Sequence, residues 1–346
     1  MSQQSKVAII GAGIAGLSCA TALNKAKFNV TVFEKSRGAS GRLSTRVTEN
    51  WQCDHGAQYF TARDGLFNAE VQRWVKAGVA QLWQPALQVF DGQFFTAKEE
   101  RDALKTMRFV GYPANNTPAK WLASALNLKT ETTVTSIKKH AQHWQISSKE
   151  HGVYPEYFDS VILAIPAPQA AVLLNTAAPK LADLCATVIM QPCFALMVKF
   201  SQKLNSTFDG LFINTGLLSW IARDSAKPGR KNKLNTETWV LHASSQWSQV
   251  NVDVPKEIVA EQMLAEFIKI IQLANVLSDA EKINLIPHSY DLHRWLYADC
   301  THYLNNVCAY DAALNIGICG DWLNGGKVQG AWLSGLNLSG QLIQQN

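Results

Sequence analysis

The chain has 346 residues, of which 47% are hydrophobic and 17% charged, and its formal net charge is +5. These values predict a globular protein with two domains, or with one large domain that carries an insertion. No dense run of Lys or Arg indicates a nucleic-acid surface. The seven cysteines are odd in number and include no Cys-x-x-Cys, which argues against a disulfide framework or a zinc site. We therefore expect reduced thiols in a cytoplasmic protein.

Two apolar segments need to be distinguished from targeting or membrane segments. Residues 7–23 follow Lys6 as in a secretory signal, but three regularly spaced glycines interrupt them. The uncharged tail from residue 328 to 346 contains Gly, Asn, Gln and Ser. We therefore expect neither a signal peptide nor a membrane span.

The first elements predicted along the chain form one βαβ unit. Residues 6–10 are a short β-branched run typical of a buried parallel strand, and residues 14–26 are rich in Ala and Leu as in a helix. Residues 29–33 then alternate as a second strand. A right-handed crossover would place the two strands side by side, as in a Rossmann-type α/β domain.

The rest of the chain alternates between helical and strand patterns. Helices are predicted over 65–78, 117–128, 256–273 and 329–342, and mixed strand and turn over 82–95. Strands are predicted over 131–137, 143–147, 160–165, 193–200, 238–243 and 315–319. Because Rossmann-like strands occur at both ends and near residue 160, we predict a discontinuous nucleotide-binding domain of residues 1–64, 115–175 and 296–346. An α+β substrate domain of residues 65–114 and 176–295 would be interleaved with it.

The first motif is Gly11-Ala12-Gly13-Ile14-Ala15-Gly16, between the first strand and its helix. Its first glycine permits a tight turn, the second lets the backbone approach a pyrophosphate, and the third allows close helix–strand contact. Glu34 ends the second strand, where a carboxylate can accept hydrogen bonds from ribose hydroxyls. The motif predicts dinucleotide binding, and by itself it allows NAD or FAD.

Two further segments favour FAD. The stretch Gly41-Arg42-Leu43 follows the acid and resembles the "GGR…T" extension of flavin amine oxidases, with Ser40 in place of one glycine. Near the C-terminus, a buried strand ends in Gly320-Asp321, and Gly330-Ala331-Trp332-Leu333-Ser334-Gly335 opens a helix. Two nucleotide-binding halves about 300 residues apart suit a long dinucleotide such as FAD.

Several longer blocks resemble bacterial renalases over essentially the whole chain. They are Asp54-His55-Gly56-Ala57-Gln58-Tyr59-Phe60-Thr61-Ala62-Arg63, the segments 164–169, 226–230, 239–248 and 293–298, and the Gly-Asp-Trp…Gly-Ala-Trp-Leu-Ser-Gly tail. The resemblance implies noncovalent FAD and a fold like p-hydroxybenzoate hydroxylase and amine oxidases. It also implies oxidation of misreduced 2- or 6-dihydro-NAD(P), with dioxygen reduced to hydrogen peroxide.

The motifs and the resemblance together assign roles to individual residues. The predicted FAD-binding residues are Gly11, Ala12, Gly13, Ile14, Ala15, Gly16, Glu34, Lys35, Gly41, Arg42, Leu43, Gly56, Ala57, Gln58, Tyr59, Val134, Gly320, Asp321, Gly330, Ala331 and Ser334. The predicted catalytic residues are His242, Tyr59 and Trp295. Trp220 and Trp322 are further candidate pocket walls, although each aromatic residue could equally be core packing.

Several assignments stay open. Arg63, Arg223, Lys227 and Arg230 could contact substrate phosphates or be ordinary exposed charges. His55 replaces an apolar residue of many relatives, and a structural role is favoured. Cys319 lies on a strand, so no covalent flavin is expected. A flavin amine oxidase and a flavin-binding sensor without turnover are the alternative functions. The sequence decides neither the NAD or NADP preference nor the oligomeric state.

Overall fold

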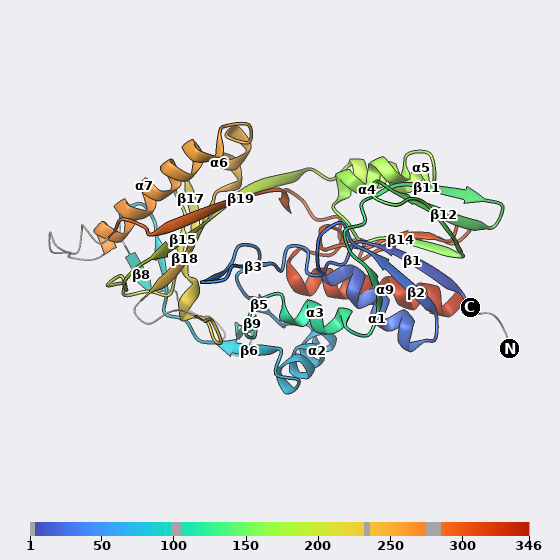
Figure 1. Ribbon diagram of the computed structural model, residues 1–346, viewed down its shortest axis with the longest axis horizontal. Coiled ribbons are helices and arrows are strands. Elements are labelled where there is room, and N and C mark those ends of the chain that lie inside the picture. Colours follow the sequence, from blue (N-terminus) through green and yellow to red (C-terminus); the bar gives the residue numbers. More distant parts are fainter. Residues whose placement is uncertain (1–3, 94, 98–105, 232–235, 275–284, 346) are drawn as a thin grey trace.

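The computed structural model describes residues 4–93, 95–97, 106–231, 236–274 and 285–345. Two sheets lie towards opposite ends of an elongated molecule, and the long strands β15 (Met190–Phe200) and β19 (Ser289–Cys300) run from one end towards the other (Figure 1). The start of β1 (Lys6–Ile10) and the end of the last helix, α9 (Lys327–Gln345), lie at the same end of the molecule. No helix among the described residues is long and apolar enough to cross a membrane.

The sheet near the termini has six strands in the order β10-β2-β1-β14-β21-β20, and only β20 is antiparallel to its neighbour. The strands are Asn127–Lys129, Asn29–Phe33, Lys6–Ile10, Ser160–Leu163, Ile316–Ile318 and Ala309–Asp311. Side chains of β1 are buried on both faces, which explains its unbroken β-branched sequence.

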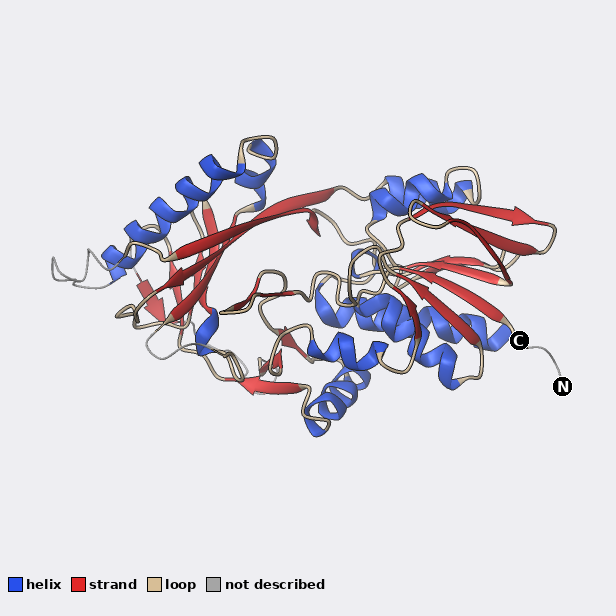
Figure 2. Cartoon of the chain, in the orientation of Figure 1, coloured by secondary structure: helices blue, strands red, loops and turns tan. Residues whose placement is uncertain are grey.

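Helices α1 (Ile14–Lys25), α3 (Thr117–Ala123) and α9 (Lys327–Gln345) cover one face of this sheet (Figure 2). The helices α1 and α9 cross closely, because a Cβ at Gly335 would lie only 2.0 Å from the Ala15 carbonyl oxygen. Ser18 Oγ also donates to the Trp332 carbonyl oxygen at 2.8 Å. The first and last helices of the chain are thereby fixed together beside the sheet.

The other face packs against a three-stranded antiparallel sheet and two short helices. These elements are β11 (Val134–His140), β12 (His143–Ser148), β13 (Gly152–Phe158), α4 (Ala167–Leu174) and α5 (Pro179–Ala186). The layers around the six-stranded sheet are therefore helices on one side and a second sheet on the other.

The second large sheet has seven strands in the order β19-β15-β18-β17-β16-β7-β8. They are Ser289–Cys300, Met190–Phe200, Glu237–Ala243, Leu218–Arg223, Gly210–Ile213, Leu87–Phe90 and Phe95–Ala97. The long helix α7 (Lys256–Ala274) buries Val259, Met263 and Phe267 against one face, and α6 (Ser245–Val250) lies at its end. The opposite face of the sheet carries the candidate substrate side chains described below.

Short elements lie between the two large sheets. They are the pair β3 (Thr45–Val47) and β4 (Gln52–Asp54), the sheet β5 (Phe60–Thr61), β9 (Arg108–Gly111) and β6 (Ala80–Trp83), helix α2 (Gly65–Lys76), and the 3-10 helices η1 (Asp224–Ala226) and η2 (Asp321–Leu323). The chain thus has the expected fold class, a Rossmann-type α/β unit with an interleaved α+β region.

Two predictions of local structure were wrong or incomplete. The helix predicted over 117–128 ends at Ala123, and Asn127–Lys129 instead pairs in parallel with β2 as an edge strand. The strands Gly152–Phe158 and Ser289–Cys300 were not predicted, because both mix exposed polar residues with partly buried ones. The domain boundaries stay a proposal, and we propose to move the boundary at 175 beyond α5, which packs in the same core as α4.

Candidate functional site

The glycine turn after β1 has the geometry that its sequence predicted. Gly11 has φ +103°, and a Cβ there would lie 2.6 Å from the Ala164 carbonyl oxygen. A Cβ at Gly16 would lie 2.0 Å from the Gly11 carbonyl oxygen. A Cβ at Gly13 would meet no protein atom within 4 Å, and no side chain caps the N-terminus of α1 there. The free N–H groups of residues 14–16 therefore face open space that suits a phosphate.

Glu34 stands beside this turn at the end of β2. Its carboxylate accepts hydrogen bonds from the Ala12 N–H and the Ser36 N–H, both at 2.8 Å. Each oxygen keeps a further lone pair, so ribose hydroxyls can still donate to it. The neighbouring Lys35 is exposed.

Arg42 joins the two halves of the predicted nucleotide site. Its guanidinium is paired with Asp321, which lies 279 residues further along the chain, and Nη1 donates to the Ala298 carbonyl oxygen at 3.0 Å. Gly41 has φ +55° and approaches Gly13 so closely that its Cβ would lie 3.1 Å from the Gly13 Cα. Residues near both ends of the chain therefore meet at one place.

The C-terminal half is held by its own short contacts. The Gly320 N–H donates to Ser334 Oγ at 2.9 Å, which ties the end of β21 to α9. A Cβ at Gly330 would lie 2.1 Å from the Asn324 carbonyl oxygen, so the first turn of α9 packs tightly on the loop before it. Ala331 is partly buried beside it.

The loop from Gly56 to Tyr59 lies against Arg42. The Ala57 N–H donates to the Arg42 carbonyl oxygen at 2.9 Å, and a Cβ at Gly56 would lie 2.0 Å from that oxygen. Gln58 Nε2 donates to the carbonyl oxygens of Asp54 and Gly56, and the Leu43 side chain is buried in the adjoining core. A dinucleotide therefore fits between the glycines at 11, 13 and 16, the open N-terminus of α1 and Glu34. The remaining predicted residue, Val134, begins β11 and packs in the core on the other face of the six-stranded sheet.

Aromatic rings and imidazoles gather on the face of the seven-stranded sheet that α7 does not cover. In neighbouring strands, His293 lies opposite Ala195, Ala195 opposite His242, His242 opposite Trp220, and Trp220 opposite Phe212. Directly opposed residues point to the same face, so these side chains form one row. The Tyr59 ring, from the Gly56 loop, lies 6.0 Å from the Trp220 ring.

Trp295 and His55 form one edge of this row. Their rings stack at 5.3 Å, and Trp295 Nε1 donates to the His55 carbonyl oxygen at 2.8 Å. The His293 ring lies 4.3 Å from Trp295 and 4.9 Å from His55. The structure thus brings all three predicted catalytic residues, Tyr59, His242 and Trp295, to the same face. His293 was missed as a separate candidate, although its spacing of two from Trp295 on a strand would have placed both on one face.

The imidazoles on this face are neutral at pH 7. Burial lowers the pKa of His55 to about 3, with the charges of His293 and Arg46 acting in the same direction. Burial also lowers the pKa of His242 to about 4, and the charge of Lys227 adds to the shift. The pKa of His293 is lowered to about 4, mainly by burial. These rings can hydrogen-bond or stack, but they hold no proton to donate as imidazolium ions.

Four charged side chains are fully buried between the Gly56 loop and the seven-stranded sheet. Lys227 Nζ lies 3.0 Å from Asp54 Oδ2 and 2.8 Å from Asp224 Oδ1, and it donates to Gln58 Oε1 at 3.0 Å. Arg230 pairs with the same Asp54 carboxylate and donates to the Gly111 and Pro113 carbonyl oxygens at 2.9 Å each.

The pKa values of the two acids in this cluster are shifted in opposite directions. Burial by itself would raise the pKa of Asp54, but the charges of Lys227 and Arg230 outweigh it and hold the pKa well below its usual range. Burial and the neighbouring Asp54 charge raise the pKa of Asp224. Asp54 is therefore the central anion of the cluster.

Both proposed interpretations were wrong for Lys227, Arg230 and Arg223. Lys227 and Arg230 are buried in ion pairs, so neither is an exposed charge nor free for a substrate phosphate. Arg223 is paired with Asp209 and Glu237. Arg63 is exposed, as in the simpler interpretation. No local pattern marks the pairing of Lys227 and Arg230 with Asp54, because 173 and 176 residues separate them from it.

Two other candidates lie outside the row of rings. Trp322 is 1% exposed in the core beside β14, and its Nε1 donates to the Ile165 carbonyl oxygen at 3.2 Å, which favours core packing. Cys319 is also fully buried, and burial raises the pKa of its thiol. Within the described ranges, no group of His, Cys, Asp and Glu side chains is arranged to hold a metal ion.

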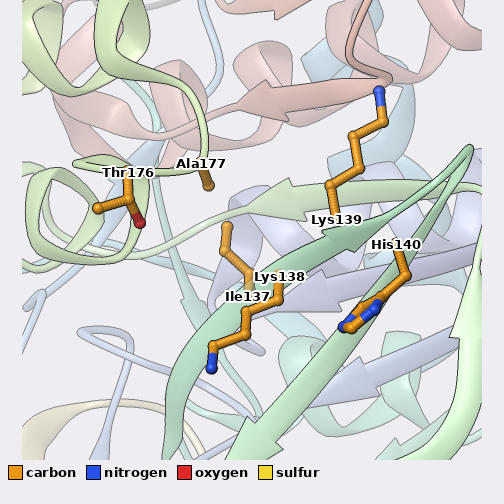
Figure 3. A pocket seen from close by; sticks show the side chains of 6 residues that line it. All are labelled: Ile137, Lys138, Lys139, His140, Thr176 and Ala177. Atoms are coloured by element: carbon orange, nitrogen blue, oxygen red, sulfur yellow. The ribbon is translucent and has the colours of Figure 1, made fainter.

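A surface pocket lies elsewhere, at the end of β11 remote from Val134. It is lined by Ile137, Lys138, Lys139, His140, Thr176 and Ala177 (Figure 3). Lys139 Nζ points away towards the Ala313 and Leu314 carbonyl oxygens, at 3.5 and 3.4 Å. None of the predicted site residues lines this pocket, so it is separate from the candidate site.

Comparisons with known proteins agree with this arrangement. Residues 9–76 match the family model of an NAD(P)-binding Rossmann-like domain, and residues 91–343 match that of flavin containing amine oxidoreductase. An alignment over 71 residues, which covers 17% of the chain, shows 45% identity to a tRNA 5-methylaminomethyl-2-thiouridine biosynthesis bifunctional protein of Magnetococcus marinus. The match spans 11% of that relative's length.

Solved structures share the fold over nearly the whole chain. A putative protoporphyrinogen oxidase from Exiguobacterium sp. 255-15 is 12% identical with a TM-score of 0.75, covering 99% of this chain and 100% of that one. Cyclohexylamine oxidase from Brevibacterium oxydans is 11% identical with a TM-score of 0.73, covering 99% of each chain.

The cofactor and the reaction class follow from the site together with these matches. The glycine turn, Glu34 and the Arg42–Asp321 junction fit the long dinucleotide FAD, held noncovalently. The chain is an FAD-dependent oxidoreductase, and it belongs to the flavin containing amine oxidoreductase family.

Proposed function

We propose that the protein is a renalase-like oxidase that oxidises 2- or 6-dihydro isomers of NAD(P) to the ordinary oxidised dinucleotide. The bound FAD would take up the hydride and pass two electrons to dioxygen, which becomes hydrogen peroxide. We further propose that it works in the cytoplasm, since all seven cysteines are free thiols in the structure.

The observation that carries the proposal is the row of rings facing the nucleotide-binding half. A dihydropyridine ring is already electron-rich, so its hydride transfer depends on stacking and orientation more than on a proton acceptor. Tyr59, Trp220 and Trp295 supply flat surfaces, and the neighbouring His242 and His293 are neutral. The resemblance of the residue blocks to renalases supports the same substrate class.

A flavin amine oxidase is the second candidate, because the matching family and a similar solved structure include enzymes of that kind. Aromatic rings can also flank an amine. However, a substrate ammonium needs a counter-charge when it is desolvated. Asp54 and Asp224 beside this face are already paired with Lys227, and Asp291 with Arg46.

Product analysis tests the proposal. Purified holoenzyme in air is incubated with 2- and 6-dihydro-NAD and -NADP, and in parallel with primary amines and polyamines. We expect one hydrogen peroxide and one oxidised dinucleotide per dihydro isomer consumed, and no peroxide from the amines. Peroxide released only with amines would reject the proposed substrate and favour the second candidate.

A further inference from the structure

Buried ring nitrogens without a protein partner lie in the row of rings. Among the described residues, three ring nitrogens of this row, Trp220 Nε1, His242 Nε2 and His55 Nδ1, are inaccessible to solvent and have no hydrogen-bond partner; the first two belong to a pair of residues on adjacent strands. The Trp220 side chain is 7% exposed. Leaving a buried donor or acceptor unsatisfied costs about 1–3 kcal/mol, so such a pair indicates a ligand that completes it.

The strand register places the two residues side by side on the same face of the sheet. His242 on β18 lies directly opposite Trp220 on β17, where Cβ atoms are about 4.5–5.5 Å apart. Both belong to the seven-stranded sheet rather than to the elements that cradle the dinucleotide. The Tyr59 ring beside Trp220 connects them to the Gly56 loop.

The two nitrogens have complementary hydrogen-bonding roles. The indole Nε1–H of Trp220 is only a donor. His242 is neutral, and we assign its ring proton to Nδ1, because the backbone of His55 raises the pKa of His242 and Nε2 has no partner; Nε2 is then the acceptor. A donor and an acceptor on two directly opposed residues match a primary carboxamide, whose C=O accepts and whose NH₂ donates. An ammonium group cannot accept the Trp220 hydrogen bond.

We propose that Trp220 and His242 bind the carboxamide of the dihydronicotinamide ring and so fix that ring over the flavin. This inference rests on the proposed function and adds to it the group by which the substrate is recognised. Trp220 contacts the carboxamide oxygen, and His242 contacts its nitrogen. The pair is therefore a specificity determinant that selects a carboxamide over a carboxylate or an amine.

Equilibrium binding to the oxidised holoenzyme in air tests this without turnover. The ligands are NAD, its 3-acetylpyridine analogue and its nicotinic acid analogue. The acetyl analogue keeps the carbonyl oxygen of the carboxamide but lacks the NH₂. Binding is followed by the change in flavin absorbance. We expect Trp220→Phe to raise the Kd of NAD and of the acetyl analogue about tenfold. We expect His242→Leu to raise the Kd of NAD alone, by a similar factor. Wild-type enzyme should bind the nicotinic acid analogue weakly.

Trp247→Phe is the matched control, since Trp247 packs with Phe194 on the α7 face of the same sheet. It should leave every Kd within twofold. The inference is overturned if both site variants leave all three Kd values unchanged while wild-type flavin is still reduced by the dihydro isomers. It is also overturned if the variants weaken retention of FAD instead, because the nitrogens would then serve the flavin. A wild-type enzyme that no dihydro isomer reduces would mark failure of the proposed function itself.

Discussion

The six-stranded and seven-stranded sheets prepare their parts of the site in different ways. At the six-stranded sheet, backbone geometry forms the site: Gly11 and Gly16 allow a tight turn and close helix–strand packing, and Gly13 leaves room for a ligand beside the helix terminus. At the seven-stranded sheet, side chains do the work, through a row of rings over a buried cluster of Lys227, Arg230, Asp54 and Asp224. The part of the site at the six-stranded sheet is determined by one short segment of sequence, and the part at the seven-stranded sheet by residues from distant segments.

The largest effect is expected from Gly16→Ala. Its Cβ would lie 2.0 Å from the Gly11 carbonyl oxygen, so α1 must move away from β1 and the FAD content should fall below about a tenth of wild type. The ratio of flavin to protein absorbance measures this. Gly13→Ala is the control for the fold, because its Cβ meets no protein atom within 4 Å. Its apoprotein should melt at the same temperature as the wild-type apoprotein, and it should bind FAD more weakly. Full FAD affinity in Gly13→Ala would contradict a pyrophosphate at this turn.

The contrast between the sheets also explains what the sequence could predict. The turn, Glu34 and the Gly320-Asp321 strand end follow from local rules of spacing, and the structure places Arg42 of one half against Asp321 of the other. The buried pairing of Asp54 with Lys227 and Arg230 was not predictable, because it joins segments about 170 residues apart and no local pattern marks it. Trp295, Tyr59 and His242 were found through family resemblance, while their shared face depends on strand register.

The buried cluster should respond unequally to neutralising its two acids. Asp54→Asn leaves Lys227 and Arg230 with one acid between them, and we expect a loss of about 3–5 kcal/mol in the free energy of unfolding. Asp224→Asn should cost clearly less, because burial already disfavours the charge of Asp224. Urea unfolding of both holoenzymes measures the difference. Equal losses would show that Asp54 is not the central anion.

The same pair gives a test by pH. The folded-state pKa of Asp224 is raised, so its protonation stabilises the folded state at low pH, and this contribution is lost as the pH rises from about 4 to about 6. The stability of wild type relative to Asp224→Asn should therefore be greater at pH 5 than at pH 7. If the stability of wild type relative to Asp224→Asn is instead smaller at pH 5 than at pH 7, the pKa of Asp224 is lowered in the folded state and not raised.

The pH dependence of flavin reduction separates the substrate classes. His55, His242 and His293 have pKa values of about 3 to 4, so none of them titrates above pH 6. The rate of reduction by a dihydronicotinamide should therefore stay within about twofold from pH 6 to 9. A rate that rises tenfold per pH unit over this range would indicate a reacting amine that must first lose its proton.

The smallest effect is expected from Trp295→Phe. The variant keeps a ring beside His55 but loses the Nε1 hydrogen bond to its carbonyl oxygen, worth about 1 kcal/mol. We expect the KM for the dihydro isomer to rise about fivefold with little change in kcat, measured by peroxide release. An unchanged KM would show that the Trp295–His55 contact lies outside the binding site.

Anaerobic stopped-flow reduction tests the central claim most directly. Oxidised holoenzyme is mixed with 2- or 6-dihydro-NAD(P), and separately with a panel of amines, while the flavin absorbance is followed. The account predicts that the dihydro isomers bleach the flavin completely within seconds and that the amines do not. Rapid bleaching by an amine, with no bleaching by any dihydro isomer, would contradict it.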